Sequence, residues 1–161
     1  MIRKAHINDL PIIHKLYSVL FDTMANLEPD YMKAAKQDEA FVKSVINEEN
    51  DFTIFVAEDN NQVQGFAIAQ LQSAPTYNCF VQQRLVYLMD LVVSPDSRGK
   101  GYGKKLIQAV KAWGMEHNVE YVELSVLTQN KKAIELYLRE GFDTFNLSMR
   151  MRIDTKKNND E

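Results

Sequence analysis

The sequence has little cysteine, little net charge and no long apolar run. Its 161 residues contain one cysteine, Cys79, which leaves no partner for an internal disulfide or for a second thiolate ligand of zinc. A formal net charge of −3 removes the long-range attraction on which nucleic-acid binding and anionic-membrane binding normally depend. No segment approaches the roughly 20 apolar residues that cross a bilayer, and the polar start predicts no secretory signal. We therefore expect a cytoplasmic chain whose partners are neither nucleic acid nor membrane.

The composition that is present is ordinary for a globular protein. Hydrophobic residues make up 45% of the chain and charged residues 25%. This length predicts one domain, over residues 1–154, followed by a polar, disordered tail over residues 155–161. The three histidines, His6, His14 and His117, are too scattered to predict a metal site, so we expect no metal.

Hydrophobic periodicity alternates between strand and helix along the chain. Apolar runs predict strands at residues 2–5, 52–57, 63–71, 86–93 and 121–127, with one or two more in residues 142–153. Helical spacing predicts four helices, at residues 9–20, 41–46, 102–117 and 131–140. Asn8 is the expected N-cap of the first helix, Asn60-Asn61 the turn of an antiparallel hairpin, and Gly141 the C-terminal cap of the last helix.

A glycine-rich loop, Arg98-Gly99-Lys100-Gly101-Tyr102-Gly103, comes directly before the third predicted helix. Glycines at every second position let main-chain amides approach a ligand, and the helix directs its positive end at the same place. Lys104 and Lys105 add further positive charge, which favours a diphosphate ligand. The spacing matches neither the P-loop pattern nor the dinucleotide pattern Gly-x-Gly-x-x-Gly. A solvated tight turn is the alternative.

Two motifs in order give the sequence a family resemblance. With the strand that precedes it, the segment Asp90-Leu91-Val92-Val93-Ser94-Pro95-Asp96-Ser97-Arg98-Gly99-Lys100-Gly101-Tyr102-Gly103 resembles the signature of the GNAT superfamily of N-acetyltransferases. Downstream, Asn130-x-x-Ala133-x-x-x-Tyr137-x-x-x-Gly141-Phe142 is similar to a later segment of that family. The resemblance implies an α/β (α+β) fold with a mixed, mostly antiparallel sheet of about six or seven strands and about four helices.

The same resemblance implies the donor site. Acetyl-CoA would be the cosubstrate, with its diphosphate held by main-chain amides from Arg98 to Lys104 and its pantetheine arm lying along Leu91, Val92 and Val93. A bulge in this strand would free the amide of Leu91 for the acetyl oxygen. The position of Asn130 implies a coenzyme contact, and that of Tyr137 implies the acid that protonates the departing thiolate.

A base is needed because an amine of pKa about 10.4 arrives protonated at pH 7. Asp90 is the best candidate, since it is the one charged residue in an apolar strand, where burial raises a carboxyl pKa. Asp90 can instead bond to backbone or hold a substrate ammonium, and some family members carry a glutamate where this chain has Met89. Glu123 is a weaker rival. For Tyr137, core packing is the alternative role, and Cys79 is expected to be structural.

The acceptor is the least determined part of the function. Residues 22–51 carry eight acidic residues against three lysines, which suggests either a cationic acceptor or a solvated surface. We expect acetyl transfer, by direct attack in a ternary complex, to a small-molecule primary amine. A protein or peptide amine is the second candidate, and a non-catalytic acetyl-CoA sensor is the alternative class. The sequence leaves a homodimer open.

Overall fold

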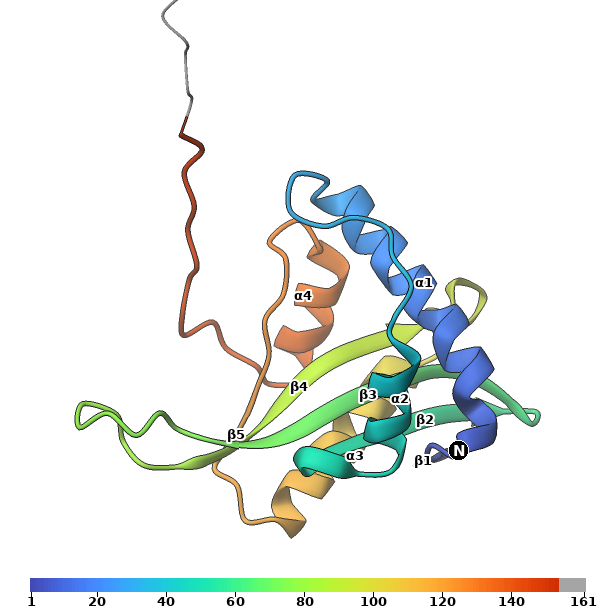
Figure 1. Ribbon diagram of the computed structural model, residues 1–161, viewed down its shortest axis with the longest axis horizontal. Coiled ribbons are helices and arrows are strands. Elements are labelled where there is room, and N and C mark those ends of the chain that lie inside the picture. The colour runs from blue at the N-terminus through green and yellow to red at the C-terminus, as the bar shows by residue number, and fades with distance from the viewer. Residues whose placement is uncertain (154–161) are drawn as a thin grey trace, which may run out of the picture.

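The computed structural model describes residues 1–153 as five strands and four α-helices (Figure 1). The elements, in chain order, are β1 (Ile2–Lys4), α1 (Leu10–Leu27), α2 (Glu39–Ile46), β2 (Phe52–Asp59), β3 (Gln62–Ser73), β4 (Arg84–Val93), α3 (Tyr102–Glu116), β5 (Tyr121–Glu123) and α4 (Lys131–Arg139). Within these described residues, no helix is both long and apolar enough to cross a membrane.

One mixed sheet forms the centre of the fold. Its strands follow the order β1-β2-β3-β4-β5, with antiparallel pairing from β1 to β4 and parallel pairing between β4 and β5. Asn60 and Asn61 adopt positive φ angles of 49° and 57° in the turn between β2 and β3. The mixed, mostly antiparallel architecture and the four helices are thus confirmed.

The expected number of strands was too high for the described part of the chain. Residues 142–153 form no strand, and only residues 121–123 of the stretch 121–127 pair with a neighbour. Alternating apolar residues favour an extended chain, but a strand also requires a backbone neighbour, which local sequence does not specify. The tail predicted for residues 155–161 lies outside the described residues.

The sheet is buried on both faces. Consecutive residues Phe66, Ala67, Ile68 and Ala69 of β3 are all 0% exposed. Phe66 and Ile68 belong to one apolar cluster with residues of α1 and α2, while Ala67 and Ala69 belong to a second cluster with residues of α3. Because side chains alternate across a strand, α1 and α2 cover one face of the sheet and α3 covers the other.

The start of α1 differs from the expectation. A short 3₁₀ turn, Ile7–Asp9, precedes the helix, so Asp9 rather than Asn8 is the residue before its first turn. The Asp9 carboxylate accepts two hydrogen bonds from the Arg3 guanidinium, at 2.7 and 3.1 Å, and one from the His6 amide. These bonds lower the pKa of Asp9, the Arg3 bond most strongly, and tie the first strand to the first helix.

Candidate functional site

The centre of the candidate site is the second half of β4, where the sheet opens. The parallel ladder between β4 and β5 ends at Tyr87 and Glu123, and β4 continues for six more residues to Val93. Beyond that point the β5 side of β4 has no strand partner among the described residues. The open side of β4 therefore offers backbone groups for a ligand to pair with.

A β-bulge in β4 decides which way its side chains face. Asp90 is opposite Ile68 and Leu88 is opposite Ala69, so Met89 is the extra residue. Leu88, before the bulge, and Leu91, after it, both pack into the cluster on the α3 side. In a regular strand, residues on one face are separated by an even number of positions, so the odd separation of these two shows the effect of the bulge. The bulge thus places Asp90 toward α1, and it confirms the expected irregularity of this strand.

Asp90 has a specific partner on α1. The Tyr17 hydroxyl donates a hydrogen bond of 2.7 Å to Oδ2 of Asp90, and the Tyr17 side chain is 0% exposed. Burial raises the pKa of Asp90, and the Tyr17 hydrogen bond offsets part of that rise by stabilising the charged form. The carboxylate is therefore held in place through one oxygen, and its pKa is raised, which is the direction that a general base at neutral pH requires.

Tyr17 is the site residue that sequence reasoning missed. On α1 it occupies one of the regularly spaced apolar positions, between the rings of Phe21 and Phe66, at centroid distances of 5.3 and 4.9 Å. Such a tyrosine looks like core packing in a sequence. Its functional contact is with a residue 73 positions away, and no local pattern reports that contact.

The glycine loop leads into α3 with unpaired amides. Gly99 and Gly101 have φ angles of 77° and 82°, in the left-handed region that favours glycine, and a Cβ on either would point into open space. The first main-chain bond of α3 runs from the Lys105 amide to the Gly101 carbonyl. The amides of residues 102–104 precede it and are left for a ligand, as at any helix N-terminus.

Neighbouring side chains shape this loop. The Arg98 Nε donates to the Val93 carbonyl at 3.3 Å, which ties the loop to the end of β4. Tyr102 is buried and its hydroxyl donates to Asp59 at 2.8 Å, so only its main chain faces the loop. Gly103 lies so close to α4 that a Cβ there would be 3.1 Å from Leu136 Cδ2. Lys100 and Lys104 are exposed and can contribute positive charge.

The helix α4 brings the second predicted motif to the same region. Asn130 is the N-cap of α4, and its side-chain oxygen accepts a hydrogen bond from the Ala133 amide at 3.3 Å. Its side-chain NH₂ is the group left to contact a coenzyme. At the other end, Gly141 has a φ of 94°, as expected for the residue that stops the helix.

Tyr137 packs on the α3 side of the sheet, opposite to Asp90. Its ring makes an edge contact with Phe142, with a centroid distance of 5.6 Å. Burial raises the pKa of Tyr137 to about 12, with a smaller contribution from the negative charge of Asp90. The two residues therefore approach the opening beside β4 from opposite faces of the sheet, and the Asp90 charge disfavours ionisation of Tyr137.

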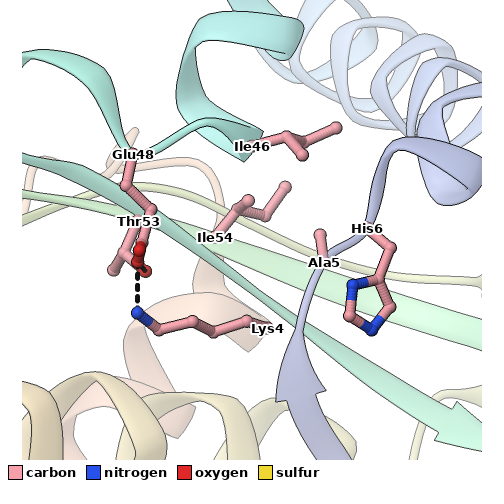
Figure 2. A pocket seen from close by; sticks show the side chains of 7 residues that line it. All are labelled: Lys4, Ala5, His6, Ile46, Glu48, Thr53 and Ile54. Atoms are coloured by element: carbon pink, nitrogen blue, oxygen red, sulfur yellow. Dashed lines mark hydrogen bonds and ion pairs between the residues drawn. The ribbon is translucent and has the colours of Figure 1, made fainter.

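Two hollows lie away from this opening. One, of about 220 Å³, is lined by residues of β1, β2 and the end of α2, and the Lys4 amine points across it to the Glu48 carboxylate (Figure 2). The other, of about 370 Å³, is lined by His14, Lys15 and Ser18 of α1 and by residues 36, 37 and 39. Neither contains a residue of β4, the glycine loop or α4. The described residues contain no cluster of three or more histidine, cysteine or acidic side chains that could hold a metal ion.

Comparison with known proteins gives a consistent result. The model of the acetyltransferase (GNAT) family matches residues 13–142. The uncharacterized N-acetyltransferase YhfO of Bacillus subtilis is 32% identical over 105 residues, which cover 65% of this chain and 67% of that protein. A mutant of the BH1408 protein of Bacillus halodurans superposes with a TM-score of 0.90 at 22% identity, covering 95% of this chain and 99% of the other. Aminoglycoside N-acetyltransferase AAC(6')-Iy in complex with CoA gives 0.73 at 19% identity, covering 96% and 99%.

Proposed function

The chain belongs to the GNAT family of acetyltransferases, and we propose that it transfers the acetyl group of acetyl-CoA to a small-molecule primary amine in a ternary complex. The observation that carries the proposal is the opening beside β4, which has the glycine loop with its unpaired amides at one end and Asp90 and Tyr137 on its two sides.

The donor side fits the diphosphate and the pantetheine arm of the coenzyme. The amides of residues 102–104 and the exposed Lys100 and Lys104 supply hydrogen bonds and positive charge for a diphosphate. Leu91 and Val93 lie on the α3 side of the unpaired half of β4, where an extended amide-containing arm can pair with the strand. The amide of Leu91, two residues after the bulge, is the proposed donor to the acetyl oxygen.

Two side chains handle the protons. Asp90, held by Tyr17, accepts a proton from the incoming ammonium, directly or through water, and its raised pKa makes it a better base than an exposed aspartate. Tyr137 then donates to the departing thiolate. With a pKa of about 12 it is fully protonated at neutral pH. Transfer to a free thiolate of pKa about 8.5 is uphill, so the donation must coincide with C–S cleavage, when the buried sulfur is most basic.

The acidic residues of the α1–α2 region give little support to a strongly cationic acceptor. Four of them are neutralised within the chain: Glu28 and Asp30 by arginines of the C-terminal segment, Glu39 by Lys43, and Glu48 by Lys4. A small amine therefore remains the first choice, in line with the aminoglycoside named for one structural relative. A protein amine is the second.

The test is thiol release from acetyl-CoA across a panel of amines, with mass spectrometry to identify the acetylated product. The panel contains aminoglycosides, polyamines, amino acids and a lysine peptide, and each reaction is compared with the same mixture without protein. We expect protein-dependent thiol release with at least one small amine. Tight binding of acetyl-CoA without release on any amine would contradict catalysis and favour a sensor.

A further inference from the structure

The larger of the two hollows, of about 370 Å³, lies between α1 and the segment that leads into α2. Figure 1 shows this segment returning beside α1 after the turn at the end of that helix. The hollow has many times the volume that one water needs, so it can take a group of several atoms. Its lining favours a polar group over an apolar one. The residues that line it are His14, Lys15, Ser18, Lys36, Gln37 and Glu39.

The charge of this hollow is net positive. Lys15 and Lys36 line it, and no acidic side chain in the described part of the chain lies within ion-pair distance of either lysine. The Glu39 carboxylate, which also belongs to the lining, is bound by Lys43 at 2.5 Å. Asp38, next to it in the chain, accepts a hydrogen bond from an amide of α2. The two lysines therefore remain available to an anion.

His14 supplies an unpaired nitrogen in the same lining. Its Nε2 atom is buried and has no hydrogen-bond partner among the residues that the structure describes. Nearly all buried polar atoms in folded proteins are paired, so an unpaired one at the wall of a hollow indicates a ligand or an ordered water. A protonated Nε2 donates a hydrogen bond, and the Ser18 hydroxyl, which lies 3.4 Å from the His14 carbonyl, can donate another. Two ammonium groups, an imidazole and a hydroxyl together suit a carboxylate.

Gln37 connects the hollow to the proposed base. It lines the hollow, and its side-chain amide lies against the Tyr17 hydroxyl as a hydrogen-bond donor. The same hydroxyl donates to Asp90 at 2.7 Å. Burial raises the pKa of Tyr17, as does the Asp90 charge, and the Gln37 bond opposes that rise. The wall of the hollow is therefore two hydrogen bonds away from the carboxylate that accepts the ammonium proton.

We propose that this hollow binds a carboxylate of the acceptor whose amine reacts beside Asp90. The proposal rests on the proposed function, because it assigns the far end of the same acceptor. Gln37 and the Tyr17 hydroxyl lie between the two groups, so the amine and the carboxylate cannot share one carbon. The acceptor class is therefore a primary amine joined to a carboxylate by a chain of several carbons. A doubly charged phosphate fits less well, because the Glu39 carboxylate is part of the lining.

The first test measures carboxylate binding without catalysis. Caproate, which has a carboxylate but no amine, is titrated into the protein while NMR follows the ring signal of His14, and caproamide is the neutral control. We expect caproate alone to shift this signal. The variant Lys15→Gln/Lys36→Gln changes two exposed side chains and should bind caproate about tenfold more weakly. Lys33→Gln, at an exposed lysine of the same segment outside the lining, should not. An unshifted His14 signal, or an equal shift with caproamide, would overturn the proposal.

The second test compares two acceptors that differ only at the far end, ε-aminocaproate and ε-aminocaproamide. We expect kcat/KM for thiol release from acetyl-CoA to be at least about tenfold higher with the carboxylate, and the doubly substituted variant to lose this preference while its rate with the amide is unchanged. Equal kcat/KM for the two acceptors would refute the carboxylate site and leave acetyl transfer intact. Absence of thiol release with every amine of the panel would refute the proposed function, and with it the acceptor role of the hollow, even if caproate still binds.

Discussion

Tyr17→Phe removes one atom from the candidate site, the hydroxyl oxygen that donates to Asp90 at 2.7 Å. The ring contacts with Phe21 and Phe66 are kept, so no cavity of more than an oxygen forms. A hydrogen bond to a charged group contributes about 1.5–3 kcal/mol, which for a domain of this size corresponds to a fall in Tm of about 3–12 °C. The loss should be largest where Asp90 is ionised.

The same change has a signature in the pH dependence of acetyl transfer. The Tyr17 bond lowers the pKa of Asp90 and burial raises it, so removal of the bond leaves burial alone and the pKa rises further. The acidic limb of kcat/KM should therefore move to higher pH. The assay is thiol release from acetyl-CoA between pH 5 and 9, with thermal unfolding in parallel and Tyr77→Phe, at a tyrosine that is 72% exposed, as the control. An unshifted limb together with an unchanged Tm would refute the role given to this contact.

Two further changes test the base and the loop. In Asp90→Asn, kcat should fall about 10²–10⁴-fold. Because the pKa of Asp90 is raised in the folded state, the contribution of Asp90 to stability is full below about pH 4 and is lost as pH rises through the folded pKa. Urea unfolding across pH 4–8 should therefore show a decrease in the free energy of unfolding that is present in the wild type and absent from the variant. A wild-type rate in D90N would assign the base to another group. Gly101→Ala meets no steric clash, but its φ of 82° costs an alanine about 1–2 kcal/mol, so calorimetry should find weaker acetyl-CoA binding, whereas unchanged affinity would place the diphosphate elsewhere.

Local patterns predicted most of the architecture because the relevant interactions are local. The Asn60-Asn61 turn and the stop at Gly141 depend on the conformations that these residues favour within a few positions, and both are present. In β3, successive side chains pack alternately into the two apolar clusters, because side-chain direction alternates along a strand. The N-cap of α1 was misplaced by one residue because a 3₁₀ turn, Ile7–Asp9, precedes the helix.

The remaining features depend on contacts between distant parts of the chain. The direction of Asp90 is set by a one-residue bulge, and its partner Tyr17 comes from the first helix. The bulge was expected from the family resemblance alone, since a bulge shifts the register without changing the composition of the strand, and the contact with Tyr17 has no signal in a single sequence. The pattern of residues 142–153 does favour an extended chain, but a strand also requires a backbone neighbour, and the local pattern specifies none.

The most direct test of the proposed function is a single-turnover measurement of acetyl transfer by the wild type and by Tyr137→Phe, at saturating acetyl-CoA and with an amine found in the panel. Single turnover isolates the chemical step from product release. We predict a rate about 10²–10⁴-fold lower in the variant, as expected for a lost general acid, with unchanged affinity for acetyl-CoA. Equal rates in the two proteins would contradict the account and assign Tyr137 to packing against Phe142.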